Sequence, residues 1–392
     1  MLDFQYYSPT RVIFGRNAVK ELGNLLKVKK RQKVLLHYGG GSVKKNGVFD
    51  AVVEQLNDAK IAYVELGGVE PNPKIDLIRE GVRLCKEQNV DFILAVGGGS
   101  VIDSAKAIAL GAKIDFDVWR LYETKERIAE ALPLGSVLTI AAAGSELSNG
   151  TVVTNPVGGL KRDYGADYLR PEFAIMNPEY TFSVSKYQTA CGTVDILMHT
   201  FERYFTHTPD VDLTDELAEG LCRAVIRAGK KAVENGSDYE ARATLMWAGS
   251  ISHNDLTGLG RRGDWATHQI EHELSGQYDR VSHGAGLAVI FPAWCRYVWK
   301  EEPERFVRFA QKIWGVDTES LTQEEAVFAG IDCCENYFRS LGMPVRLSEM
   351  DIGDEHLSEM AIKGTYFGKR TLGGFKVLDK KDIEAIYRIA LK

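Results

Sequence analysis

Short apolar segments alternate with amphipathic helical patterns through the first half of the chain, and this alternation limits the possible folds. The apolar segments cover residues 33–38, 62–66, 91–96 and 134–140, and helical patterns cover 18–26, 47–57 and 74–88. Such an alternation predicts a doubly wound, mainly parallel sheet with helices on both faces. From about Thr189 onward the apolar residues repeat with the helical period, which predicts helices at 188–205, 213–234, 239–255 and 303–316. Because 392 residues exceed what one core usually supports, we expect an α/β domain at 1–182 and an all-helical domain at 183–392.

Two glycine-rich turns follow apolar segments of the predicted sheet. The first consists of Gly39, Gly40, Gly41 and Ser42, and the second consists of Gly97, Gly98, Gly99 and Ser100. Glycine lets the backbone approach a phosphate closely, and the N-terminus of a following helix supplies free N–H groups and partial positive charge. The pattern is not G-x-G-x-x-G, so it does not predict a standard Rossmann fingerprint. A tight turn without a ligand is the alternative, but the presence of two such turns favours a nucleotide site.

Four of the eight histidines belong to one arrangement in the second half of the chain. Asp195 and His199 are four residues apart, as are His268 and His272, and His283 follows. Residues at this spacing project from the same face of a helix. One carboxylate and two or three imidazoles from separate helices suit a divalent cation such as Zn²⁺ or Fe²⁺. A surface hydrogen bond is the alternative for each pair, but the apolar residues around Asp195 suggest burial, and the spacing leaves open which histidines bind.

Composition excludes several classes of partner. The net charge is −6 and the pI is about 5.9, so a basic surface for nucleic acid or an anionic membrane is not expected. No apolar run is long enough to span a membrane. The six cysteines form no CxxC pair, and the N-terminus lacks the basic and apolar regions of a signal peptide. We therefore expect a protein of the reducing cytoplasm.

Several motifs in order along the chain resemble one family. They lie at residues 38–47, 71–73, 97–106, 144–146 and 372–376, together with the four-residue-spaced metal pairs. On these motifs the chain resembles the iron-containing, or metal-dependent, alcohol dehydrogenases, and within them the butanol dehydrogenase-like, NADPH-dependent aldehyde reductases. The resemblance covers nearly the whole chain. It is far more specific for fold and cofactor class than for substrate.

The resemblance implies a dinucleotide-binding α/β domain followed by a helical metal-binding domain of the dehydroquinate synthase-like fold, with the active site in the cleft between them. It implies the metal ligands Asp195, His199, His268 and His283, with His272 beside the metal as a candidate proton relay. Histidine suits that task because its ordinary pKa lies near neutrality.

The resemblance also implies cofactor contacts in the first domain. It places Gly97, Gly98, Gly99 and Ser100 on the pyrophosphate, Asp103 near the nicotinamide end and Thr139 near the adenosine half. Asn149 is a candidate contact for the nicotinamide or the substrate, with a turn-forming role as the alternative. Many relatives carry Thr immediately before Gly-Ser-Glu, where this chain has Ala143. We expect the lost hydroxyl to weaken or rearrange cofactor binding without abolishing activity.

The turn at 39–42 predicts the choice of cofactor. Enzymes that select NAD usually present a carboxylate to the ribose 2′-OH, and this turn contains no acid until Asp50. Ser42 can donate to a phosphate, and Lys44 and Lys45 lie close in sequence. We therefore predict that NADP(H) is preferred over NAD(H). The alternative is that both lysines belong to a solvated helix face.

The predicted activity is the interconversion of primary alcohols and aldehydes, with reduction of a small aldehyde by NADPH as the favoured direction. The alternatives are a polyol phosphate dehydrogenase or a dehydroquinate synthase-like lyase of the same fold, and a non-catalytic nucleotide-binding protein. The lyase and the polyol phosphate enzyme would need a basic cluster, for which Arg261-Arg262 and Lys161-Arg162 are the candidates. Trp247, Trp265 and Phe291 would narrow a pocket or pack in the core. The N-terminal strand and the family together suggest a homodimer.

Overall fold

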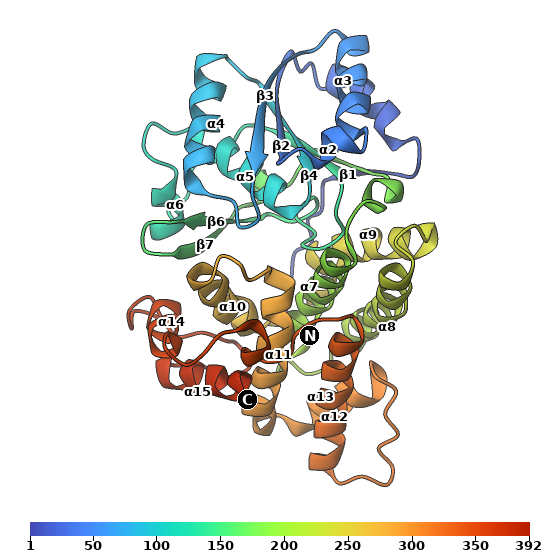
Figure 1. Cartoon of the computed structure of the whole chain (residues 1–392), viewed down its shortest axis with the longest axis vertical. Helices are drawn as coiled ribbons and strands as arrows, with labels where there is room; N and C mark the ends of the chain where they lie inside the picture. Colours follow the sequence, from blue (N-terminus) through green and yellow to red (C-terminus); the bar gives the residue numbers. More distant parts are fainter. The chain divides into compact units, whose positions relative to one another are not determined.

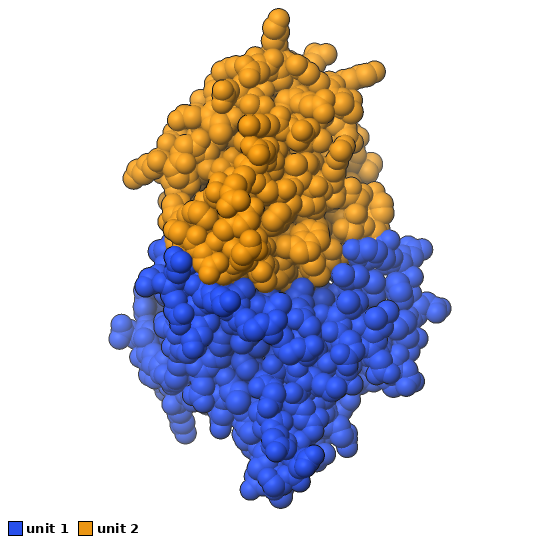
Figure 2. All heavy atoms as spheres, turned by 90° about the vertical axis from the view of Figure 1, so that its right-hand side faces the viewer, with its two compact units in different colours: residues 1–6, 185–235, 255–392 blue, residues 7–184, 236–254 orange.

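The computed structural model describes residues 1–392, which form two compact units. One unit contains residues 7–184 and 236–254, and the other contains residues 1–6, 185–235 and 255–392 (Figure 2). The predicted boundary at 182/183 lies two residues before the main transition at 184/185. The helices of this structure include none that is both long and apolar enough to cross a membrane.

A six-stranded parallel sheet forms the centre of the unit that contains residues 7–184, the α/β unit (Figure 1). The strand order is β1-β8-β5-β4-β2-β3, and every paired neighbour is parallel. The strands are β1 (Arg11–Phe14), β2 (Lys33–Gly39), β3 (Ala62–Val69), β4 (Phe92–Gly97), β5 (Leu134–Leu138) and β8 (Phe173–Met176). The connection from β2 leads outward to β3, and the chain then returns to β4 on the other side of β2. The sequence order therefore reverses between β2 and β4.

Helices cover both faces of this sheet because its strands are apolar on both sides. Along β4, Phe92, Leu94 and Val96 belong to one buried cluster, while Ile93 and Ala95 belong to the other. The first cluster packs under α1 (Leu22–Val28) and α3 (Val48–Ala59), and the second under α4 (Ile75–Glu87) and α5 (Gly99–Gly111). Full burial of both strand faces is typical of doubly wound parallel sheets. The predicted fold class of this part is confirmed.

Smaller elements complete the α/β unit. They are α2 (Ser42–Lys45), α6 (Trp119–Thr124) and the antiparallel pair β6 (Gly150–Asn155) and β7 (Leu160–Gly165). The helix α9 (Tyr239–His253) also groups with this unit, although its sequence position lies within the predicted helical domain. Its Ser250 hydroxyl donates a hydrogen bond to Glu146, which follows β5.

The other unit, drawn blue in Figure 2, is built from helices, as its sequence period predicts. They are α7 (Lys186–Tyr204), α8 (Asp212–Glu234), α10 (Ala266–Gln277), α11 (His283–Val298), α12 (Pro303–Lys312), α13 (Gln323–Ser340), α14 (Leu357–Gly364) and α15 (Lys380–Leu391). The helix α7 packs against α8 and α11, and α11 packs against α10. Gly284 permits the close approach of α11 to α7, because a Cβ atom there would overlap the carbonyl oxygen of Cys191.

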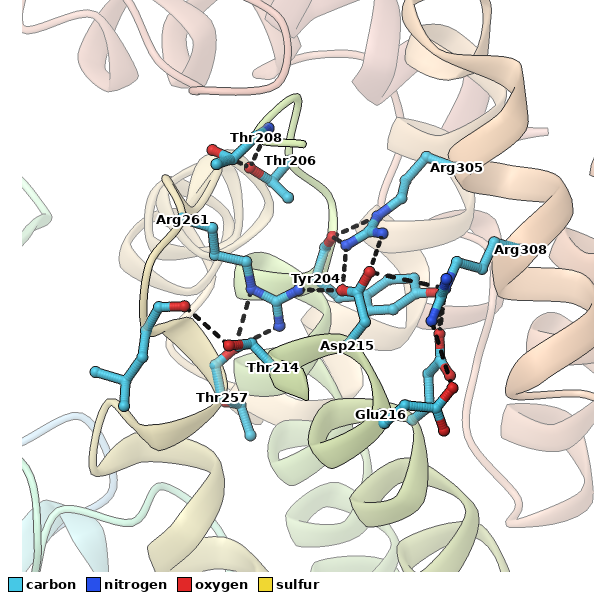
Figure 3. Close-up of polar contacts among 12 residues, drawn as sticks. Tyr204, Thr206, Thr208, Thr214, Asp215, Glu216, Thr257, Arg261, Arg305 and Arg308 are labelled. Atoms are coloured by element: carbon cyan, nitrogen blue, oxygen red, sulfur yellow. Dashed lines mark hydrogen bonds and ion pairs between the residues drawn. The ribbon is translucent and has the colours of Figure 1, made fainter. Parts of the chain in front are cut away.

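A buried ionic cluster ties distant parts of the helical unit together (Figure 3). Asp215 of α8 lies between the guanidinium groups of Arg261 and Arg305, and it accepts hydrogen bonds from both. Arg305 also donates to the carbonyl oxygen of Tyr204 at the end of α7. Arg308 lies one turn further along α12 and donates to Glu219 of α8. The cluster therefore fixes α7, α8, α12 and the segment before α10 relative to one another.

Candidate metal centre

The helix α7 presents three polar side chains toward the interior of the helical unit. Asp195, His199 and Glu202 occupy positions i, i+4 and i+7, which share one helix face. All three are buried, and Asp195 retains only 4% of its exposure. Ser185 caps the start of this helix by accepting a hydrogen bond from the backbone N–H of Gln188. A helix with a capped start therefore holds these three side chains in fixed positions inside the helical unit.

Three imidazoles surround one oxygen of Asp195. Its Oδ1 lies 3.4 Å from Nδ1 of His199, 3.7 Å from Nε2 of His268 and 3.7 Å from Nε2 of His283. The three histidines come from α7, α10 and α11, respectively. Asp195 Oδ1 and His268 Nε2 are buried and have no hydrogen-bond partner. Buried polar atoms without a partner are costly, so this arrangement needs a further group to satisfy it.

A divalent cation fits these ligand atoms. Bonds of about 2.1 Å to nitrogen and oxygen in a tetrahedral arrangement would separate the ligand atoms by about 3.4 Å. The three separations between Asp195 Oδ1 and the imidazole nitrogens, 3.4–3.7 Å, are close to this spacing. Nitrogen and oxygen donors suit Zn²⁺ and Fe²⁺ alike. The structure thus brings together the four residues predicted as ligands.

Two buried glutamates lie behind the histidines. Oε1 of Glu202 is 2.9 Å from Nδ1 of His268, and Oε2 of Glu271 accepts from Nδ1 of His283. Sequence analysis missed both residues. The available signal was the placement of Glu202 two turns after Asp195, and of Glu271 three residues after His268. Neither spacing reveals a partner on another helix.

His272 lies beside the centre and is not one of the three histidines that surround Asp195 Oδ1. Its ring is 5.6 Å from the ring of His283, between centroids, and it is half-buried. One ligand-capable atom from each of Glu271, His272 and His283 falls within 4.8 Å of the others. Another group of the same kind comprises Asp195, His199 and His268. His272 thus adjoins the centre through His283.

Trp265 forms part of the surroundings of the same centre. Its ring lies edge-on to His199 at 6.2 Å and to His268 at 5.5 Å. The guanidinium of Arg203 lies over the indole at 4.6 Å. Phe291 is instead packed among Phe201, Phe205 and Phe309, which makes it a core residue. Of the three candidates for a narrowed pocket, Trp265 contacts the metal-centre histidines, Phe291 lies in the core, and Trp247 is 42% exposed.

The two glycine-rich turns of the α/β unit lie on adjacent strands. Tyr38, which precedes Gly39, pairs with Val96, which precedes Gly97. The strand order reverses between these two strands, and ligands of open parallel sheets bind outside the carboxyl ends at such a point. The helix α5 begins directly after Gly98, so its free N–H groups face this edge.

Other predicted cofactor residues lie along the same edge. The backbone N–H of Thr139, which follows β5, donates to the carbonyl oxygen of Gly97. Ser42 starts α2 after Gly41, whose φ of 112° lies in the left-handed region. Asn149 donates from its amide to Asp167 and also accepts the N–H of Ala166 at its carbonyl. Both partners lie 17 or 18 residues away in the sequence, so these contacts join two segments and are not the local contacts of a turn.

Asp103 is engaged by the protein itself. Its Oδ1 accepts from the Ser145 hydroxyl at 2.6 Å, and its Oδ2 accepts from the Val152 N–H at 3.0 Å. Burial raises the pKa of this carboxyl. One turn further along α5, buried Lys106 donates to the carbonyl oxygens of Ser145, Ser148 and Gly150. Burial lowers the pKa of that lysine to about 8. Together Asp103 and Lys106 fasten the segment 145–152 to α5.

Several basic residues singled out in the sequence have protein partners. Lys44 lies 3.2 Å from Glu65 and also over the rings of Tyr38 and Phe49. Arg261 is committed to Asp215 and to the carbonyl oxygen of Thr257. A substrate phosphate would have to displace Asp215 to reach Arg261, so Arg261 is a poor candidate for the basic site that the polyol phosphate enzyme or the lyase would need.

Comparison with known proteins identifies the family. Residues 9–178 match the family described as iron-containing alcohol dehydrogenase, and residues 189–391 match the C-terminal domain of the Fe-containing alcohol dehydrogenase family. The chain is 44% identical to the probable NADH-dependent butanol dehydrogenase 1 of Bacillus subtilis, over 100% of both chains. It is 36% identical to the NADPH-dependent aldehyde reductase YqhD of Escherichia coli, over 95% of both.

A solved structure extends this similarity to the fold. The NADH-dependent butanol dehydrogenase A of Thermotoga maritima superposes with a TM-score of 0.96 at 39% identity, over 100% of this chain and 99% of that one. The expected reaction class, an oxidoreductase of alcohols and aldehydes that uses a nicotinamide cofactor, is confirmed at this level. The chain belongs to the iron-containing alcohol dehydrogenase family.

Proposed function

We propose that this chain reduces small aldehydes to primary alcohols with NADPH, at a single divalent metal held by Asp195, His199, His268 and His283. The observation that carries the proposal is the convergence of three imidazoles on one buried carboxylate oxygen at 3.4–3.7 Å. The names of the bacterial relatives, butanol dehydrogenase and aldehyde reductase, support the substrate class. Fe²⁺ and Zn²⁺ both suit the donor set, and availability decides which is bound.

Different residues of the chain have different roles in the reaction. A divalent cation supplies Lewis acidity toward the substrate oxygen. Its four ligands hold that cation, and the Trp265 ring limits the space beside His199 and His268. His272 exchanges a proton with the substrate oxygen through a ring nitrogen, directly or through water. Gly97, Gly98, Gly99 and Ser100 bind the pyrophosphate at the start of α5.

The preference for NADP(H) rests on the turn at residues 39–42. Ser42 starts α2, and Lys45 is exposed at its end, so both are available for a 2′-phosphate. Lys44 is the weaker candidate because Glu65 already pairs with it. The relatives differ on this point: the B. subtilis protein is named NADH-dependent and the E. coli protein NADPH-dependent.

A steady-state assay tests the proposal. The protein is freed of metal with a chelator, reloaded with Fe²⁺ or Zn²⁺, and supplied with butanal and either NADPH or NADH. We expect activity to return only with metal, and kcat/KM to be higher with NADPH. A clear preference for NADH would overturn the cofactor assignment alone. Turnover of phosphorylated polyols, with none of butanal, would overturn the substrate class.

We also propose a homodimer and a cytoplasmic location. The strand β1 lies at one edge of the sheet and pairs only with β8, which leaves its outer edge open to a second strand. Phe14, the last residue of this strand, and Tyr7, which precedes the strand, are exposed aromatic residues. All six cysteines are free thiols, as suits a reducing compartment. Light scattering coupled to size-exclusion chromatography measures the mass in solution, and a monomer would contradict the dimer.

A further inference from the structure

A single carboxylate oxygen receives two N–H groups from the same histidine. Oε1 of Glu202 lies 2.8 Å from the backbone nitrogen of His268 and 2.9 Å from its Nδ1. The side chain of Glu202 is 2% exposed, so water cannot take the place of either contact. An ionised carboxylate only accepts hydrogen bonds, so the backbone nitrogen and Nδ1 of His268 must both be donors. The proton of the imidazole is thereby assigned to Nδ1.

This contact fixes the direction of the other ring nitrogen. When the ring is neutral, a proton on Nδ1 leaves the lone pair on Nε2, which lies 3.7 Å from Asp195 Oδ1. Nε2 is buried without a hydrogen-bond partner. A metal ligand needs this state: a neutral ring with its free nitrogen directed at the ion and its other N–H held by an acceptor.

The same oxygen also anchors the helix that carries the ligand. His268 is the third residue of α10, and its backbone N–H is among those without a partner inside the helix. Trp265, at the cap position, does not cap the helix with its side chain. Glu202 of α7 supplies an acceptor for the backbone N–H of His268, and its negative charge suits a helix N-terminus. Moreover, the carbonyl oxygen of Glu202 accepts the N–H of Asp264, which precedes α10.

We propose that Glu202 is a positioning residue, which sets the tautomer of His268 and holds the backbone of that residue against α7. Glu202 thereby links the ligand on α10 to the ligands on α7. Glu271 has the corresponding relation to His283, because its Oε2 accepts from Nδ1 while Nε2 of His283 lies 3.7 Å from Asp195 Oδ1. Glu202 differs in holding the backbone as well as the ring. This inference rests on the metal site proposed above.

Metal binding by the full-length protein provides the test, independent of turnover. Metal-free wild type, Glu202→Ala and Glu202→Gln are titrated with Zn²⁺ in competition with a chromophoric chelator. We expect Glu202→Ala to weaken Zn²⁺ binding about 10- to 100-fold. Glu202→Gln keeps an oxygen that can accept both N–H groups, so we expect it to recover most of that loss. The visible absorption of Co²⁺-loaded protein should shift in Glu202→Ala, because that band reports ligand geometry.

Glu219→Ala is the matched control. Glu219 is a buried glutamate of the same helical unit, paired with Tyr204 and Arg308 and not with a metal-centre histidine. Its loss should destabilise the fold and leave Zn²⁺ affinity within about twofold of wild type. Folded Glu202→Ala with wild-type Zn²⁺ affinity and an unchanged Co²⁺ spectrum would overturn the positioning role. So would equal weakening by Glu219→Ala. A wild type that binds no Zn²⁺ or Co²⁺ would instead refute the metal site itself.

Discussion

Arg305 binds Asp215 through two hydrogen bonds of 2.6 Å, one to each carboxylate oxygen. Both side chains are almost completely buried, and Arg261 donates to the same carboxylate. Two-point pairing of this kind fixes the angle of the guanidinium plane as well as its distance. The pair therefore holds α12 on α8 with little freedom to rotate.

Removing the charge of Asp215 should strongly destabilise the helical unit. In Asp215→Asn, two buried guanidinium groups lose their counter-charge, and breaking a buried pair typically costs about 3–5 kcal/mol. We expect a clear fall in the thermal unfolding midpoint measured by circular dichroism. The control is Asp332→Asn, which removes an exposed partner of Arg296 and should cost about 0–1 kcal/mol. Equal effects in the two variants would contradict a structural role for the cluster.

Buried His37 should make stability depend on pH in the acidic range. Its two ring nitrogens contact the Leu66 carbonyl oxygen and the Ser104 hydroxyl, and burial lowers its pKa from 6.5 to about 4. Between these values the unfolded chain binds a proton that the folded chain does not, so stability falls as the pH drops from 6.5 to about 4. We expect His37→Gln to lose stability less steeply over this interval.

Urea unfolding of metal-free wild type and His37→Gln at several pH values measures that difference. The difference between the two proteins cancels the contribution of other acidic groups. Parallel curves between pH 4 and 6.5 would show that His37 does not titrate in this way.

His268 and His272 should respond differently to the same substitution. We expect His268→Ala to lose both metal and activity, because its Nε2 faces Asp195. His272→Ala should retain one metal per chain and turn over more slowly, by about 10²–10⁴-fold if general acid catalysis is lost. Elemental analysis of each purified variant, alongside kcat, separates the roles. Loss of metal from His272→Ala would contradict the relay assignment.

Ala143→Thr should tighten cofactor binding. The Ala143 side chain faces the start of α5, since a Cβ atom on Gly99 would lie 2.9 Å from it. A hydroxyl there can reach a phosphate bound at Gly99, and one hydrogen bond contributes about 0.5–1.5 kcal/mol. We therefore expect KM for the preferred cofactor to fall by about 2- to 13-fold. Ala143→Val has the same shape without the hydroxyl, and an equal fall in that variant would rule out the hydrogen bond.

The sequence predicts relations within an element better than relations between elements. Strand and helix periods identify the doubly wound sheet and the helical unit, and the four-residue spacing places Asp195 beside His199. Nothing in the spacing indicates that Glu202 of α7 meets His268 of α10, because that contact depends on how two helices pack. The same limit applies to α9, which is plainly helical in sequence but groups with the α/β unit.

Partners also decide what a charged residue can do. Lys44 follows a phosphate-binding type of turn, yet Glu65 lies within ion-pair distance on the neighbouring strand β3. Asp103 is predicted to lie near the nicotinamide, while its two oxygens accept hydrogen bonds from Ser145 and Val152. These partners lie tens of residues away in sequence, so composition and periodicity carry no sign of them.

The candidate ligands on α7, α10 and α11 also have a consequence for assembly. A cation bound by Asp195 and His283 cross-links the chain across the whole interval from residue 195 to residue 283. The entropy of closing so long a loop must be overcome before the last ligand can bind, so tight metal capture has to wait until these helices have packed. Once bound, the ion favours the packed state by mass action, and its loss would first loosen the contacts among α7, α10 and α11.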